Sequence, residues 1–179
     1  MNIIEKSKKY AIECHNSINQ MYDDKKYDHH LKMAVSTAHK FIYLVSEKYK
    51  ENVISGCWCH DLIEDVSSVT FNDLKKETNE MVAELAYACT NEKGRNRAER
   101  ANDKYYEGIR NTKYATFVKL CDRIANVEYS LDSKNRMFEM YNKEQDHFKS
   151  LLYSVEYDDM WNYLDDIFKL YNNSKTYNV

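Results

Sequence analysis

Residues 57–66 read Cys57-Trp58-Cys59-His60-Asp61-Leu62-Ile63-Glu64-Asp65-Val66. The chain is organised around this stretch, which sets one histidine and three carboxylates in an apolar run. On a helix, His60 and Glu64 are four residues apart and share a face. The same spacing separates Asp61 from Asp65, so all four side chains are expected on one side of the helix. Acidic side chains near the end of a helix are unfavourable beside its negative dipole, so a compensating cation is expected, and a divalent metal ion is the natural candidate. The alternative is a partly exposed helix with solvated acids, and this stretch by itself leaves both open.

The composition indicates one globular domain covering residues 1–179. Hydrophobic residues make up 43% of the 179, which is enough for a core. The formal net charge of −3 argues against a nucleic-acid-binding surface. No apolar run has the length of a membrane span, and residues 1–6 lack the pattern of a signal peptide. Five cysteines without zinc-type spacing favour a reduced, cytoplasmic protein, and the sequence does not indicate an oligomeric state.

The pattern of the chain predicts an all-α bundle. There is no proline, there are three glycines, and no alternating apolar pattern typical of strands is present. Thr70 and Asp73 have the spacing of a capping box that opens a short helix, and Thr78 is expected to cap the next helix. Loops are predicted at 22–26 and 91–96, a frayed end at 172–179, and the other helices at 3–21, 28–47, 50–65, 97–109, 113–131, 135–154 and 157–171.

A second candidate ligand lies upstream, in the pair His29-His30. Since Ala34 follows four residues later, His30 can face the core on a helix while His29 points to solvent. An isolated histidine is more often a surface or capping residue. That interpretation is kept for His15, His39 and His147.

A third candidate lies downstream, at Asp122. It is embedded in an apolar stripe, and a buried aspartate is unfavourable unless it is paired or bound to a metal. Asn126, one turn later, shares its face and could hydrogen-bond a phosphate or orient a ligand. The alternative is an ion pair of Asp122 with Arg123 or Lys119 at the margin of the core.

Taken together, these candidates predict a metal site between helices. His30, His60, Asp61 and Asp122 supply two imidazoles and two carboxylates from different helices. Helix bundles hold metal ions between facing side chains in this way. Mixed nitrogen and oxygen ligands favour Mn²⁺ or Fe²⁺ over a closed structural zinc site.

The loop at 90–100 is the other functional candidate, because it concentrates basic residues in a chain that is acidic overall. Cations on a glycine-containing loop before a helix suit a polyphosphate. Lys93 and Arg97 are the preferred phosphate contacts. The alternative is a solvated, charged loop.

The order His…His-Asp…Asp resembles that of the HD-domain metal-dependent phosphohydrolases. The pattern His60-Asp61-x-x-Glu64-Asp65, with Val69-Thr70-Phe71 after it, is similar to the RelA/SpoT-type hydrolase domain. So is the later pattern Val118-Lys119-Leu120-x-Asp122-Arg123-x-x-Asn126. Single-domain relatives of that type are the small alarmone hydrolases, including the metazoan SpoT homologues. The resemblance covers about residues 8–150, with the helix at 157–171 appended.

The resemblance implies a role for each matched residue. His30, His60, Asp61 and Asp122 would hold one Mn²⁺, and Glu64 and Asp65 would activate and orient the attacking water. Asn126 would touch a phosphate or the ribose of a nucleotide substrate, and Tyr141 would lie beside the nucleotide. The implied reaction removes the 3′-pyrophosphate of guanosine tetra- or pentaphosphate.

The sequence departs from that family at the expected base-binding positions. A basic Arg-Lys pair before the first metal histidine is replaced by Gln20-Met21-Tyr22, a following proline by Leu31, and a threonine by Tyr129. Tyr22 could take over the missing stacking and change the base preference. Three interpretations therefore stay open: a (p)ppGpp-type hydrolase, an HD hydrolase of another nucleotide phosphoester (an adenine alarmone, NADPH or nucleoside phosphates), and a non-catalytic nucleotide- or partner-binding module.

Overall fold

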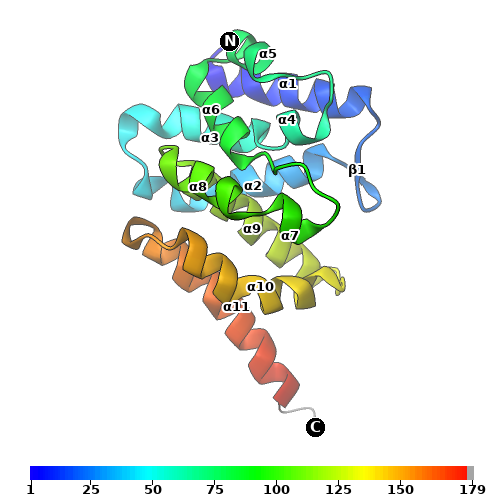
Figure 1. The fold of residues 1–179 in the computed structure, drawn as a ribbon, viewed down its shortest axis with the longest axis vertical. Helices are drawn as coiled ribbons and strands as arrows, with labels where there is room; N and C mark the ends of the chain where they lie inside the picture. The colour runs from blue at the N-terminus through cyan, green and yellow to red at the C-terminus, as the bar shows by residue number, and fades with distance from the viewer. Residues whose placement is uncertain (177–179) are drawn as a thin grey trace.

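The computed structural model describes residues 1–176, and it is a helical bundle with one very short hairpin (Figure 1). This confirms the predicted all-α class. None of the described helices is both long and apolar enough to cross a membrane. The elements are α1 (Ile3–Ser17), β1 (Met21–Tyr22), β2 (Lys25–Lys26), α2 (Asp28–Phe41), η1 (Ile42–Leu44), η2 (Glu47–Tyr49), α3 (Lys50–Cys59), α4 (Leu62–Asp65), α5 (Phe71–Glu77), α6 (Glu80–Cys89), α7 (Arg97–Arg100), α8 (Asp103–Asn111), α9 (Ala115–Asp132), α10 (Met137–Leu152), η3 (Val155–Tyr157) and α11 (Asp158–Thr176).

The centre of the bundle is formed by α2, α3 and α9, which pack on one another. On the outer side of α3 lie α1 and α6, and α10 and α11 cover the other end of α9 (Figure 1). The close approach of α3 and α6 depends on Gly56, because a Cβ atom there would lie 2.7 Å from Leu85 Cδ1. Buried apolar side chains from all of these helices form one continuous core. The helices that supply the candidate ligands are thus the most deeply packed ones.

The largest difference from the predicted elements is a break in the helix expected over 50–65. The helix α3 ends at Cys59, and α4 begins after Asp61, which is its N-terminal flanking residue. Nδ1 of His60 is 2.9 Å from the carbonyl oxygen of Cys57 and so takes up one of the carbonyl groups left open at a helix end. The prediction that the four polar residues share one helix face is therefore wrong, since the chain turns at His60 and Asp61.

Other boundaries differ for local reasons. The first helix stops at Ser17 because Asn19 adopts a left-handed conformation with φ of 51°. The helix expected over 97–109 is two helices, since Asn102 caps α8 through the backbone N–H of Tyr105. The capping box at Thr70 is confirmed, whereas the next helix is capped by Asn79 and not by Thr78.

Three further segments also differ from the predicted secondary structure. The helix expected over 28–47 ends at Phe41 and continues as η1. The loop expected at 22–26 forms the antiparallel β1–β2 hairpin. Residues 172–176, expected to be frayed, belong to α11, and 177–179 lie outside the described residues.

Candidate metal centre and the cavity around it

Four polar side chains, from α2, the junction of α3 and α4, and α9, meet at the centre of the bundle. The Nε2 atoms of His30 on α2 and His60 after α3 lie 3.2 Å apart. Oδ2 of Asp61 lies 3.4 and 3.0 Å from these two nitrogens. Oδ1 of Asp122 on α9 lies 3.3 and 3.6 Å from them. Two ligand atoms about 2.1 Å from one ion are roughly 3.0–3.5 Å apart in octahedral or tetrahedral geometry, and the separations among His30, His60 and Asp122 are close to this range.

The two imidazoles are oriented for ligation. Both are buried, with 2% of His30 and 1% of His60 exposed. Because the carbonyl of Cys57 can only accept, Nδ1 of His60 carries a hydrogen, and Nε2, which faces Asp61 and Asp122, is the nitrogen available to a metal ion. Among the described residues, the ligand atoms of His30, His60 and Asp122 all lie within 4.8 Å of one another. The set of nitrogen and oxygen donors is one that a divalent transition metal accepts.

The two carboxylate oxygens of Asp122 have separate partners. Oδ1 faces the imidazoles and accepts a hydrogen bond from Asn126 Nδ2, while Oδ2 accepts from Lys119 Nζ at 2.8 Å. Burial alone would raise the pKa of Asp122, but the charge of Lys119 and hydrogen bonds from the histidines lower it well below its usual value. The ion pair with Lys119 and the ligand position therefore coexist.

Asp61 is held by a tyrosine. The hydroxyl of Tyr27 donates to Oδ2 of Asp61 at 2.6 Å, on the same oxygen that faces the histidines. Burial alone would raise the pKa of this carboxyl, but the nearby His60 and His30 lower it well below its usual value. Asp61 thus stays ionised, as a metal ligand must.

Glu64 and Asp65 point to different surroundings. Both oxygens of Glu64 accept from Asn91, at 2.7 Å from Nδ2 and 3.2 Å from the backbone N–H, and Glu64 lines the cavity at the candidate metal centre. Asp65 is partly buried, accepts from Gln20 Nε2 at 2.7 Å, and is not among the described residues that line this cavity. Burial and the charge of Asp61 raise the pKa of Asp65. Of the two acids, Glu64 is the one that lines the cavity.

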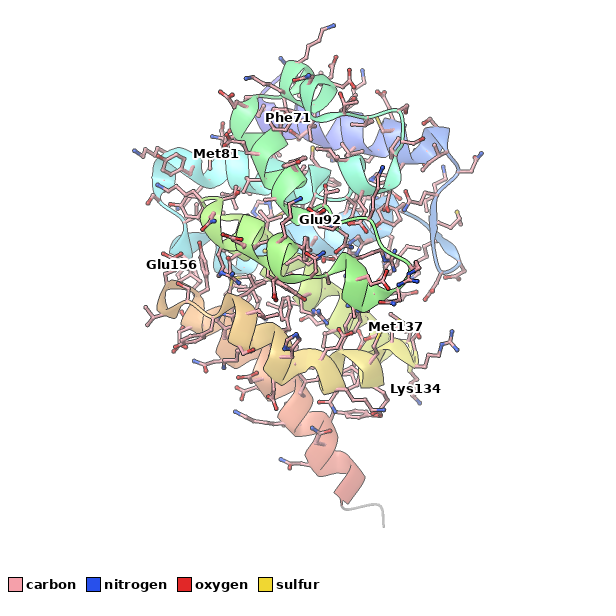
Figure 2. All side chains as sticks on the ribbon, in the orientation of Figure 1. Phe71, Met81, Glu92, Lys134, Met137 and Glu156 are labelled. Atoms are coloured by element: carbon pink, nitrogen blue, oxygen red, sulfur yellow. The ribbon has the colours of Figure 1, made fainter. Side chains whose placement is uncertain are left out.

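Basic side chains line the same cavity as the candidate metal ligands, and we call these two parts of its wall the basic side and the metal side. Glu144 accepts from Arg97 at 2.7 and 3.0 Å and from Arg123 at 3.3 Å. Tyr141 lies between these two arginines, with its ring centre 4.7 Å from the guanidinium of Arg123 and 5.8 Å from that of Arg97. In Figure 2, Glu92 marks the segment that leads to α7 and Met137 marks the start of α10. The residues of this side that line the cavity are Arg97, Arg100, Lys119, Arg123 and Tyr141.

The structure separates the two predicted phosphate contacts. Arg97 lines the cavity, but Lys93 is exposed and lines a different depression that includes Tyr87 and Lys104. Arg100 lies in the cavity instead. Asn126 also lines the cavity, with its amide engaged by Asp122 and by the hydroxyl of Tyr22 at 2.8 Å.

Sequence reasoning missed the residues that hold the acids. His15, expected at the surface or as a cap, is 1% exposed, because its ring packs 4.4 Å from that of Tyr27 and its Nδ1 is 2.6 Å from Gln20 Oε1. Tyr27 and Asn91 likewise bond to acids 34 and 27 residues away. No local spacing signals such contacts. For Tyr27, its position one turn before His30 was the only available hint.

The fold is similar to a solved structure from a metazoan ortholog of SpoT, a protein described as hydrolysing ppGpp and playing a role in starvation responses. The TM-score is 0.73, with 95% of this chain and 96% of that chain covered at 20% sequence identity. No protein-family model matches the sequence, and no curated protein matches it either. The similarity confirms the predicted fold class, a SpoT-like, HD-type helical bundle.

Proposed function

We propose that this protein is a metal-dependent phosphohydrolase that removes the 3′-pyrophosphate from nucleotides of the (p)ppGpp type. The observation that carries the proposal is the convergence of two imidazoles and two carboxylates, with each carboxylate 3.0–3.6 Å from the imidazole nitrogens, at a cavity that Glu64 and basic side chains also line. The shared fold with a protein described as a ppGpp hydrolase supports it. A non-catalytic module would have no need for a ligand set and a carboxylate base together.

His30, His60, Asp61 and Asp122 would hold the ion, for which Mn²⁺ is the first choice and Fe²⁺ the second. A bound ion would lower the pKa of a water molecule and offset negative charge on a phosphate oxygen. Buried imidazoles and ionised carboxylates suit this purpose because they need little rearrangement on binding.

Glu64 would take the proton from the attacking water. Its two oxygens are fixed by Asn91, so the carboxylate is held at the edge of the cavity in one orientation. A positioned carboxylate base of this kind contributes about 10²- to 10⁴-fold to rate. Gln20 holds Asp65 outside the cavity lining, so Asp65 would not contact the water. It would orient the water indirectly, through the adjacent Glu64.

The basic side would bind the phosphates. Arg97 and Arg123 present planar guanidinium groups suited to phosphate oxygens, and Arg100 adds a third. The ring of Tyr141 would pack beside the nucleoside. Asn126 would act chiefly on Asp122, and Lys93 would meet only a substrate that extends beyond the cavity.

One observation favours a second substrate class. Tyr22 lines the cavity with its ring stacked on His30, at a centre distance of 5.0 Å and an interplanar angle of 21°. An aromatic ring there, in place of the basic pair expected from the resemblance, changes what a base would meet. The alternative substrates are an adenine alarmone, the 2′-phosphate of NADPH and nucleoside phosphates.

The test is product chromatography with Mn²⁺ on guanosine tetraphosphate, its adenine counterpart, NADPH and simple 3′- and 5′-nucleotides. Pyrophosphate released from guanosine tetraphosphate is the expected result. Turnover of another member alone would transfer the function to that substrate. Bound metal with no turnover of any member would contradict catalysis and favour a binding module.

A further inference from the structure

The segment 20–27 touches the acids of the site from one side. It contains the β1–β2 hairpin at the edge of the bundle, with a left-handed Asp23 at the turn (φ of 52°) (Figure 1). Three of its side chains, those of Gln20, Tyr22 and Tyr27, each donate a hydrogen bond toward an acid of the site or toward that acid's partner. We call this segment the 20–27 hairpin.

Tyr27 acts directly on one carboxylate. Its hydroxyl is 2.6 Å from Oδ2 of Asp61, the oxygen that faces both histidines. A carboxylate that already accepts one hydrogen bond has fewer orientations open to it. The ring of Tyr27 packs on His15, so the hydroxyl is itself held in place.

Tyr22 acts through an amide. Its hydroxyl donates to Oδ1 of Asn126 at 2.8 Å, and the amide nitrogen of Asn126 faces Asp122, whose carboxylate can only accept. That nitrogen donates to Oδ1 of Asp122, the oxygen that faces the histidines. If the amide were reversed, its oxygen would face the carboxylate and repel it.

Gln20 is oriented in the same manner. Its Oε1 lies 2.6 Å from Nδ1 of His15, and its Nε2 donates to Asp65 at 2.7 Å. Because the carboxylate of Asp65 can only accept, the amide nitrogen of Gln20 faces it, and Oε1 is left to accept from Nδ1 of His15. Gln20 therefore holds an acid that is not a candidate ligand, whereas Tyr22 and Tyr27 act on ligands.

We propose that the 20–27 hairpin is a positioning element that presets the ligand carboxylates through Tyr27 and Tyr22 and the neighbouring acid Asp65 through Gln20. Partners of metal ligands orient them and tune their affinity. A hairpin with two-residue strands is not stable by itself, so its bonds to the acids also hold the hairpin in place. Metal binding and hairpin order are therefore linked in both directions. The inference about Gln20 also rests on the proposed function, because an effect on Asp65 is measured as a change in catalytic rate.

The first test is Mn²⁺ titration of the full chain by calorimetry, with Tyr27→Phe, Tyr22→Phe and Gln20→Leu. Each tyrosine variant keeps its ring and loses only a hydroxyl. Tyr43→Phe is the matched control, because its hydroxyl donates to the exposed Asp159 at 2.8 Å. Tyr27→Phe should weaken Mn²⁺ binding about 10- to 100-fold, and Tyr22→Phe about 3- to 10-fold. Tyr43→Phe should bind as the unaltered protein does.

Gln20→Leu distinguishes the loss of a specific contact with Asp65 from a general disturbance of the site. Its Mn²⁺ affinity should stay unchanged while kcat falls about tenfold, with little change in KM. Wild-type affinity in both Tyr27→Phe and Tyr22→Phe would overturn the proposal. So would an equal loss of affinity in Tyr43→Phe, or a loss in Gln20→Leu as large as in Tyr27→Phe.

A second measurement covers the case in which a variant does not fold. In the unaltered protein, Mn²⁺ should slow amide hydrogen exchange across 20–27 more than across the turn at 133–136. Equal or absent slowing would overturn the linkage. Neither the titration nor the exchange needs a substrate. A protein that hydrolyses no nucleotide but shows the expected affinities would lose the proposed function and keep the positioning role.

Discussion

The metal side and the basic side of the cavity are stabilised by different means. On the metal side, His30 and His60 are buried and the carboxylates receive hydrogen bonds from inside the bundle. On the basic side, Arg97 is 48% exposed, and its partner Glu144 is 31% exposed. Exposed ion pairs of this kind are worth about 0–1 kcal/mol. The metal side is therefore preorganised, and on the basic side the contact of Arg97 with Glu144 is one that a phosphate can replace, while the side chain of Arg123 is only 6% exposed.

Asp61→Ala should have the largest effect, because it removes a ligand from the preorganised side. Mn²⁺ affinity should fall by at least about 100-fold, beyond the range for a partner of a ligand, and turnover should be lost with it. Calorimetric titration and product chromatography measure both. Turnover that persists in the presence of a chelator would contradict a single-metal mechanism.

Glu64→Gln tests the edge of the cavity, where the metal side and the basic side meet. It should lower kcat about 10²- to 10⁴-fold because it removes the base. Mn²⁺ affinity should be unchanged, since Glu64 bonds Asn91 and not a histidine. Asn91→Asp, which leaves the base in place but repels it, provides a comparison. Normal hydrolysis by Glu64→Gln would show that the base lies elsewhere.

Arg97→Ala tests the basic side alone. It should raise KM about tenfold, the effect of losing one charged hydrogen bond to a phosphate, while Mn²⁺ affinity stays the same. Arg95→Ala is the control, because Arg95 pairs with Glu99 and is 91% exposed outside the cavity. If both variants raise KM equally, the effect belongs to the charge of the loop and not to a contact.

The smallest expected effect is the pH dependence of the Glu144 contacts. Burial alone would raise the pKa of Glu144, but Arg97 and then Arg123 lower it below its ordinary value of 4.5. A carboxylate with a lowered folded pKa stabilises the protein above its unfolded pKa and loses this contribution as pH falls through the folded pKa. The unaltered protein should thus exceed Glu144→Gln in stability by about 0–1 kcal/mol near pH 6, with the difference decreasing as the pH falls below 4.5 through the lowered pKa of the folded state.

Urea unfolding of both proteins across that range measures the difference. The direction in which the stability difference changes with pH tests the role of Glu144, because the other acids titrate equally in the two proteins. A difference that grows toward low pH would mean that Glu144 is protonated in the folded state and does not hold the arginines.

The sequence by itself determined the fold class and the candidate ligand set. The absence of proline and the helical spacing of apolar residues favour long helices everywhere, and the His60-Asp61 pair together with His30 and Asp122 is typical of a metal site between helices. These features are local patterns, so they can be read along the chain. The resemblance to SpoT-type hydrolases in fold was likewise confirmed by the structural similarity.

The tertiary structure alone decided how that set is held and which neighbours face it. The break at His60, the hydrogen bond from Tyr22 to an amide 104 residues away, and the exclusion of Lys93 from the cavity have no local signal. Hydrogen bonds and ion pairs between distant segments depend on how the helices pack, because each needs two side chains brought within about 3 Å. The candidate ligands can therefore be recognised from their spacing along the chain, while their orientation depends on how the helices pack.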